Sequence, residues 1–263
     1  MLIVYSKSDE VGSCIASHLM KIIDFDAKID LIGTTLPYSD DIKAALIELN
    51  GELVNAEYLD GIGMGTILFL SKHSSAKNVP AYTVHSTGNW SGEALLGGKP
   101  HALSVSDPML MCALLRSLSK MNNESTMQVT YEATHHGPLL DTPSVFVEIE
   151  KNSFNNERCM LVARSIVDAI KNSSLCKDMP IAIGIGGTHY SARFTSIALS
   201  GKYAFSHIMP KYYVDEIAMA KHAIERSVPK ASLAVIEWKS INSAKREIIL
   251  RELEKSGIPY ERI

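Results

Sequence analysis

The chain has 263 residues, of which 46% are hydrophobic and 21% are charged, and it carries a formal net charge of −3. This length suits one large domain over residues 1–263, and the composition excludes a wholly disordered chain. The negative charge excludes a strongly basic surface, so any contact with nucleic acid has to come from a local patch.

The first half of the chain alternates β-type apolar runs with helical patterns. The predicted strands cover residues 2–5, 67–70 and 81–84. The predicted helices cover residues 11–22, which Ser8 or Asp9 caps, and 108–118, which Asp107 and Pro108 open.

The second half continues this alternation. Its predicted strands cover residues 127–132, 145–149, 180–183 and 233–236. Its predicted helices cover residues 155–171, 215–225 and 241–255. We expect the first two of these strands to be neighbours. The whole pattern predicts an α/β fold, a single domain with a mixed, mainly parallel sheet covered by helices on both faces.

The lengths of the apolar runs and the spacing of the cysteines indicate the cellular compartment of the protein. No apolar run reaches the roughly 20 residues of a membrane-spanning helix, and no secretory leader is recognisable. We therefore expect a cytoplasmic protein with no membrane partner. Because the cysteines are scattered without a C-x-x-C pair, we expect buried small side chains rather than disulfides or a sulfur-bound metal. They are Cys14, Cys112, Cys159 and Cys176.

Polar segments rich in histidine follow several predicted strands. They are HSTGN at 85–89, THHGP at 134–138, GIGGTHYS at 184–191 and HIMPKY at 207–212. Parallel sheets place ligands at the loops that leave the carboxyl ends of their strands. Histidines that are distant in the sequence can therefore converge there, and this is where we expect the functional site.

The double histidine His135 and His136 has two interpretations. In a continuing strand the two side chains point to opposite faces, whereas a turn would bring both inward. A structural hydrogen-bonding role is as plausible for the pair as a metal-binding or catalytic one. Glu132 and Glu148 favour the second, because carboxylates beside imidazoles bind zinc, orient a histidine or act as a general base.

The glycine-rich segment 184–189 resembles a phosphate-binding loop only superficially. It lacks the Lys and Ser/Thr of a P-loop and has the wrong spacing for a dinucleotide loop, so a tight turn is an equal alternative. Either way, His189 and Tyr190 would be displayed to a ligand. Ser191 lies in no nucleophile motif.

The remaining polar candidates are individually weak. Ser86, Thr87 and Asn89 suit a turn or the binding of a substrate oxyanion or amine. A lone histidine such as His207 is more often structural than functional. The cations near the histidine segments suit a phosphate-bearing substrate, although each alone is typical of a solvated surface. They are Arg193, Lys202 and Lys211.

Taken in this order, the four histidine segments resemble the D-aminoacyl-tRNA deacylases of the archaeal and plant type. The likeness runs from Met1 into the final helix. Two departures affect the expected loop shape rather than the chemistry. Glu150 and Lys151 replace a small Gly-Ser pair, and Ala192 stands where a proline is usual.

The resemblance implies a hydrolase that cleaves the ester between a D-amino acid, such as D-tyrosine, and the 3′ end of tRNA. It also implies zinc as cofactor and an α/β core related to phosphorylases and peptidyl-tRNA hydrolases. Zinc bound by neutral imidazoles can lower the pKa of its water to about 7 and polarise a carbonyl. We expect a monomer without a stable protein partner.

Roles for individual residues follow as hypotheses. His135, His136 and His207 are the expected zinc ligands. His189 completes the set or carries a proton, His85 supports the centre, and Glu132 or Glu148 orients a histidine or acts as base. The expected substrate contacts are Thr87, Asn89, Thr188 and Tyr190, with Arg193, Lys202 and Lys211 at the tRNA phosphates.

Three alternatives remain open at the level of sequence. Histidine and glutamate alone, or the 2′-hydroxyl of tRNA, would activate water without a metal. A zinc-dependent amidase or peptidase, or a nucleoside phosphorylase-like enzyme, would act on small substrates. A non-catalytic protein would bind the tRNA end through structural histidines.

Overall fold

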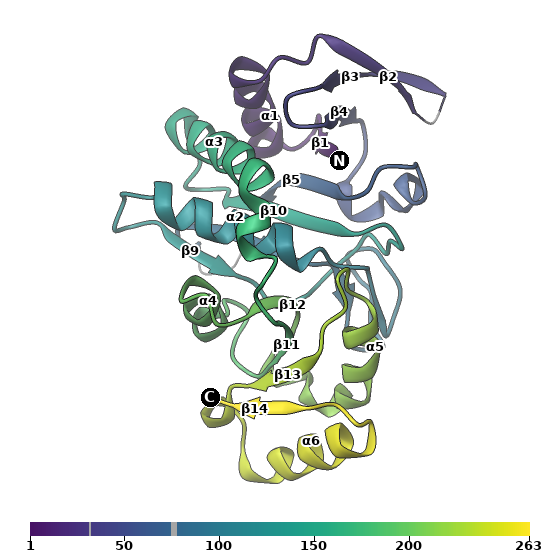
Figure 1. Ribbon diagram of the computed structural model, residues 1–263, viewed down its shortest axis with the longest axis vertical. Helices are drawn as coiled ribbons and strands as arrows, with labels where there is room; N and C mark the ends of the chain where they lie inside the picture. The colour runs from purple at the N-terminus through teal and green to yellow at the C-terminus, as the bar shows by residue number, and fades with distance from the viewer. Residues whose placement is uncertain (32, 75–77) are drawn as a thin grey trace.

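The centre of the fold is an eight-stranded sheet, shown in the computed structural model, which describes residues 1–31, 33–74 and 78–263 (Figure 1). In spatial order its strands are β2 (Ala27–Leu31), β3 (Thr34–Ser39), β4 (Ala44–Leu49), β1 (Leu2–Ser6), β5 (Ile67–His73), β10 (Ser144–Glu150), β6 (Ala81–His85) and β9 (Gln128–Tyr131). Strands β4, β1, β5 and β10 are mutually parallel, and β6 and β9 run opposite to them. The sheet is mixed, as predicted.

A second, smaller sheet lies beside the first (Figure 1). It is entirely parallel and contains, in spatial order, β12 (Ala204–Met209), β11 (Ile181–Ile185), β13 (Leu233–Ile236) and β14 (Tyr260–Arg262). The chain after β9 joins the two sheets, because Ala133 N donates to His189 O at 2.8 Å and Thr134 N donates to Ile208 O at 2.9 Å. A short ribbon pairs β7 (Gly88–Asn89) with β8 (Ala102–Leu103).

Helices cover both faces of the large sheet, although those on the second face are short. The α-helices are α1 (Glu10–Ile22), α2 (Pro108–Met121), α3 (Asn156–Asn172), α4 (Ala192–Leu199), α5 (Ala220–Glu225) and α6 (Ser243–Lys255). The 3-10 helices are η1 (Leu53–Asn55), η2 (Glu57–Leu59), η3 (Ser173–Cys176), η4 (Lys211–Met219) and η5 (Trp238–Ser240). Successive strand side chains point to opposite faces. Leu68 and Val147 therefore pack with α1, α2 and α3, and Phe69 and Phe146 pack with η1 and η2.

Most predicted elements are confirmed, and two expectations are wrong. Strand β6 lies between β9 and β10 and pairs with both, so the strands predicted at 127–132 and 145–149 are not neighbours. The helix predicted over 215–225 is 3-10 as far as Met219, with non-helical dihedrals at Glu216, and is α-helical over the remaining residues in α5. Cys112, Cys159 and Cys176 are buried, as expected, whereas Cys14 is only partly buried. Among the described residues, no helix is both long and apolar enough to cross a membrane.

One carboxylate fixes α1 to the end of β5. Asp9 caps the helix by accepting from Val11 N at 3.0 Å and Gly12 N at 2.9 Å, and its second oxygen accepts from Lys72 N at 2.9 Å. The helix comes so close to the sheet that a Cβ at Gly12 would lie 2.3 Å from Leu70 O. A glycine is therefore required at this crossing.

Replacing Gly12 with alanine tests this close approach. Alanine is favoured over glycine by about 1 kcal/mol in a helix interior, but the clash with the Leu70 carbonyl outweighs that gain. We expect Gly12→Ala to lower the free energy of unfolding by roughly 1–3 kcal/mol in urea denaturation. Gly51→Ala is the matched control, because its Cβ would meet nothing within 4 Å. Equal stability of the two variants would contradict the packing.

Candidate active site

Histidines and carboxylates gather on the second face of the large sheet. Phe146, Glu148 and Glu150 alternate along β10 and so share one face. The His85 ring, at the end of β6, stacks on Phe146 with 5.3 Å between ring centroids. Because β6 and β9 run opposite to β5 and β10, the side chains meet over this face rather than at one carboxyl edge, where we expected them.

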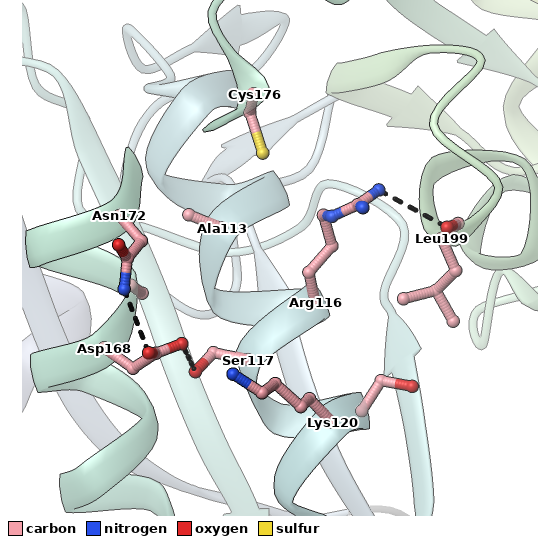
Figure 2. A pocket seen from close by; sticks show the side chains of 10 residues that line it. Ala113, Arg116, Ser117, Lys120, Asp168, Asn172, Cys176 and Leu199 are labelled. Atoms are coloured by element: carbon pink, nitrogen blue, oxygen red, sulfur yellow. Dashed lines mark hydrogen bonds between the residues drawn. The ribbon is translucent and has the colours of Figure 1, made fainter. Parts of the chain in front are cut away.

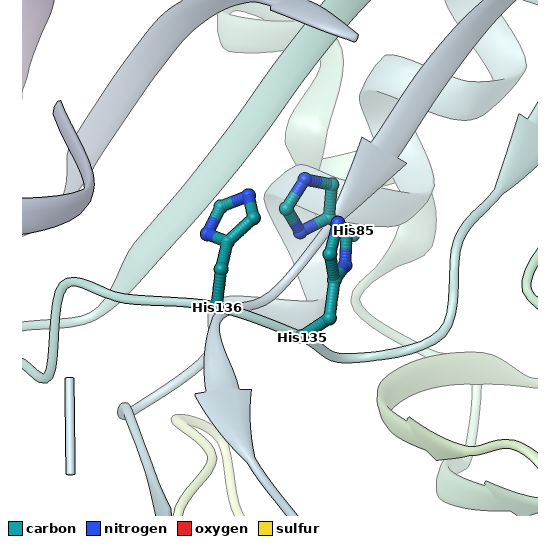
Figure 3. A group of neighbouring side chains, drawn as sticks. All are labelled: His85, His135 and His136. Carbon is teal, nitrogen blue, oxygen red and sulfur yellow. The ribbon is translucent and has the colours of Figure 1, made fainter. Parts of the chain in front are cut away.

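Three of these histidines form a compact group (Figure 3). The ring centroids of His85 and His135 lie 4.4 Å apart, and those of His135 and His136 lie 4.3 Å apart. His136 has a left-handed backbone with φ of 43°, so a turn brings both members of the double histidine inward. One candidate metal-ligand atom from each of the three lies within 4.8 Å of the others.

Backbone carbonyls orient all three rings. Nδ1 of His135 is 2.9 Å from Ala133 O, Nδ1 of His136 is 2.5 Å from Gly137 O, and Nδ1 of His85 is 3.1 Å from Ser86 O. Since a carbonyl only accepts, each Nδ1 carries the hydrogen, and Nε2 keeps its lone pair when the ring is neutral. Histidines that bind metals are usually oriented in this way.

Glu132 connects histidines from three segments. Its Oε1 lies 2.9 Å from His73 Nδ1, and its Oε2 lies 3.3 Å from His189 Nε2 and 3.6 Å from His135 Nε2. The carboxylate is fully buried, whereas the His189 side chain is 35% exposed. His189 is thus the member of this group that is most accessible to a substrate.

Glu148 makes a second set of contacts. Its Oε2 lies 3.4 Å from His73 Nδ1 and 3.5 Å from His85 Nε2. Two further groups of side chains could hold a metal ion. One consists of His73, Glu132 and His189, and the other of His85, Glu132 and Glu148. His73 therefore bridges both carboxylates.

The buried charges are balanced in pairs. Burial alone would raise the pKa of Glu148 and lower that of His73. Their mutual hydrogen bonds and charges outweigh it, so the pKa of Glu148 falls to about 2 and that of His73 rises to about 10. The pKa of Glu132 is also held well below its usual range, and that of His85 is raised, chiefly by Glu148.

The pKa values of the double histidine are lowered, in contrast to those of His73 and His85. Burial, followed by the charges of His136 and His85, holds the pKa of His135 well below its ordinary value. Burial and the charge of His85 lower the pKa of His136 to about 4. Both rings are therefore neutral near pH 7, which is the form that binds a metal or accepts a proton.

These side chains open on a cavity of about 330 Å³, whose wall includes His73, His135, His136, Glu148 and His189. A larger cavity of about 490 Å³ lies between α2 and α3 (Figure 2). Its wall has no histidine, and its Asp168 is engaged by the Ser117 hydroxyl at 2.7 Å. The smaller cavity is therefore the candidate active site.

His207 lies outside the histidine group, contrary to its expected place among the ligands. Its Nδ1 is 3.0 Å from Ser86 Oγ, and its Nε2 is 2.9 Å from the Arg226 carbonyl. The side chain is fully buried, and burial lowers its pKa to about 4. Both ring nitrogens of His207 thus face protein atoms, whereas the His85 ring lies beside those of His135 and His136.

The expected substrate contacts separate into two kinds. Thr87 is buried, with its Oγ1 2.9 Å from Pro138 O, and Asn89 Nδ2 donates to Gly97 O at 3.0 Å, so both hold loops in place. Thr188 is exposed and donates to the Tyr190 carbonyl at 2.9 Å. The Tyr190 ring lies 5.5 Å from the His73 ring.

The three expected phosphate-binding cations are all exposed. Lys202 forms an ion pair with Glu261 on β14. Arg193 and Lys211 instead both act on Glu237, where they oppose the rise in its pKa that burial causes. Glu237 therefore lies within electrostatic range of both Arg193 and Lys211.

His73 and Glu150 were not predicted as site residues. His73 follows the predicted strand 67–70 just as His85 follows 81–84, so the same rule would have found it. Glu150 ends β10 opposite His73, with its Oε2 3.9 Å from His73 Nε2. The departure from the family pattern at Glu150 therefore concerns the site and not only the shape of a loop.

Fold and site together define an α/β protein with a buried histidine and carboxylate centre that opens on a cavity. The family model described as D-aminoacyl-tRNA deacylase matches residues 61–261, so the chain belongs to the D-aminoacyl-tRNA deacylase family, whose members are hydrolases. The relation to phosphorylases and peptidyl-tRNA hydrolases stays a prediction.

Individual relatives agree with this assignment. The D-aminoacyl-tRNA deacylase of Ignicoccus hospitalis is 41% identical over 199 residues, which cover 73% of this chain and 78% of that protein. The D-aminoacyl-tRNA deacylase of Pyrococcus furiosus is 31% identical over 98% of both chains. The crystal structure of a conserved protein of unknown function superposes with a TM-score of 0.88, at 32% identity, over 99% of this chain and 94% of that one.

The neutral state of His207 predicts a pH dependence of stability. In the unfolded chain a histidine takes up a proton near its ordinary pKa of 6.5, whereas folded His207 does so only near 4. The folded state therefore loses on the order of 3 kcal/mol relative to the unfolded state as the pH falls across this window. We expect His207→Gln to remove this part of the pH dependence in urea denaturation between pH 7 and pH 4. An unchanged slope would contradict the buried, neutral state.

Proposed function

We propose that this chain hydrolyses the ester bond between a D-amino acid and the 3′ end of tRNA, releasing the free D-amino acid and tRNA. The observation that carries the proposal is the convergence of His85, His135 and His136 with Glu132 and Glu148 behind one cavity, whose wall includes His135, His136 and Glu148. Membership of the deacylase family supports the substrate.

Ester hydrolysis needs a water nucleophile, and it moves a proton from that water to the leaving ribose oxygen. Water attacks the carbonyl carbon, and the bond to the ribose oxygen breaks as that oxygen gains a proton. His189 is partly exposed, and Glu132 holds its Nε2 at 3.3 Å. His189 is therefore placed to take the proton from water and to return it to the ribose, a role of general acid and base.

Zinc is the cofactor that the donor set fits. His85, His135 and His136 would hold it through Nε2, because their Nδ1 atoms face carbonyls. His85 Nε2 is buried, and the atom it faces is Glu148 Oε2, which is 3.5 Å away. A zinc ion there would act as a Lewis acid on the ester carbonyl and on water. His85 would give up its proton on binding it, since a ligating imidazole is neutral.

The tRNA phosphates would be met by Arg193 and Lys211, which are exposed, while Glu261 engages Lys202. The overall charge of −3 gives little long-range attraction for tRNA. Binding should therefore depend on such local contacts and weaken with salt.

Hydrolysis of matched D- and L-tyrosyl-tRNA tests substrate, stereochemistry and metal together. We expect cleavage of the D-ester in preference to the L-ester, loss of activity with a chelator and recovery with zinc. His136→Ala should lower kcat by about 10²-fold or more, and near-normal turnover of that variant would exclude the role.

Other outcomes identify the alternatives. Activity that ignores the chelator would reject the zinc mechanism and favour histidine and glutamate, or the tRNA 2′-hydroxyl. Salt-insensitive cleavage of free N-acyl amino acids or nucleosides would favour a small-substrate enzyme. Tight tRNA binding without cleavage under any metal condition would favour a binding protein.

Zinc content distinguishes the two possible ligand sets. We expect His85→Ala and His135→Ala to weaken zinc binding by more than about 100-fold, measured by equilibrium dialysis and elemental analysis. His207→Gln is the matched control and should keep its zinc, because both nitrogens of His207 face protein atoms. A folded His207→Gln protein that has lost its zinc would restore His207 to the ligand set.

A further inference from the structure

Two consecutive leucines are exposed at the mouth of the active-site cavity. Leu95 is 86% exposed and Leu96 is 63% exposed, and Leu96 forms part of the cavity wall. Among the described residues they are the one pair of adjacent large apolar side chains exposed in this way. Apolar surface beside a functional cavity is typical of a binding site.

Hydrogen bonds hold the loop that carries these leucines. Gly137 N donates to Leu96 O at 2.8 Å, and Asn89 Nδ2 donates to Gly97 O at 3.0 Å. Gly137 directly follows His136, so a single hydrogen bond connects Leu96 to the histidine turn. The position of the leucines is thereby fixed relative to the catalytic groups.

Close packing adds to this rigidity. A Cβ at Gly97 would lie 1.9 Å from Val54 O, and the backbone there has φ of 75°. Gly98 N donates to Glu57 Oε1 at 3.2 Å. A loop held in this way loses little conformational entropy when a ligand binds, so the exposed apolar surface is preorganised.

The position of the substrate follows from the size of the cavity. A volume of about 330 Å³ is at the lower end of the range for small-molecule pockets. It can hold an aminoacyl group but not the tRNA. Since the ester joins the amino acid to the last nucleotide, that nucleotide has to lie at the mouth of the cavity, where Leu96 forms part of the wall.

We propose that Leu95 and Leu96 form an apolar platform that binds the adenine base of the terminal nucleotide of tRNA, an inference that rests on the proposed function. Bases bind through their flat apolar faces in contacts that tolerate any sequence. The amino-acid side chain is the less suitable occupant, because Leu95 faces solvent outside the cavity, where the ester cannot reach the histidines.

Kinetics of the double variant Leu95→Ala/Leu96→Ala tests the platform. We expect KM for D-tyrosyl-tRNA to rise by about 10-fold, while kcat changes by less than about 2-fold. On D-tyrosine methyl ester, which has no nucleotide, the single variant Leu95→Ala should keep the kcat/KM of the wild type, because Leu95 is not part of the cavity wall. Ile248→Ala is the matched control, because Ile248 is 48% exposed on α6 and does not line the cavity.

A binding measurement keeps the two proposals separate. Removing the terminal adenosine from uncharged tRNA should weaken its binding to the wild type by about 10-fold and to the double variant by less than about 2-fold. A wild type that shows this dependence but cleaves no ester would overturn the proposed function and support the platform.

Each of three results would overturn the platform and leave the proposed function untouched. One is an unchanged KM for D-tyrosyl-tRNA in the double variant. Another is a loss of kcat/KM on the methyl ester in Leu95→Ala, which would assign Leu95 to the aminoacyl group. The third is an effect of the same size in Ile248→Ala.

Discussion

The pairing of two buried carboxylates with two imidazoles is the interaction on which the site depends. Glu132 and Glu148 are removed from water, and they stay ionised because His73 and His85 lie within 3.5 Å of their oxygens. Removing one partner of a buried ion pair costs about 3–5 kcal/mol, since the other charge stays buried and uncompensated. The four groups therefore form a unit that assembles together. Burial, together with the charge on His85, keeps the double histidine neutral, which is the form that can bind a cation or accept a proton.

Local patterns in the sequence predict the elements well but not their arrangement. Alternation and helical spacing identify the strands and the longer helices, and Asp9 and Asp107 cap helices where expected. The order of the strands depends on β6 inserting between β9 and β10, and no local pattern contains that information. The reversal of β6 has a direct effect on the site, because it moves the meeting point of the histidines from an edge to a face of the sheet.

Local sequence patterns also cannot decide which histidines meet at the site. His85 and His207 both belong to strands rich in apolar residues, and the sequence gives no reason to prefer one as a ligand. The difference arises from Ser86, which is 121 residues from His207, and from the Arg226 carbonyl, which is 19 residues away. Such contacts depend on how the two sheets dock. Glu150 could be placed from its alternation with Glu148, but only once β10 was known to continue that far.

The seam between the two sheets has a consequence for how the protein loses activity. His189 follows β11 of the small sheet, whereas Glu132, which lies 3.3 Å from its ring, follows β9 of the large one. A small separation of the sheets would part His189 from Glu132 while every strand and helix stayed intact. Heat inactivation should therefore precede the loss of secondary structure, and catalysis becomes a sensitive reporter of docking between the two halves.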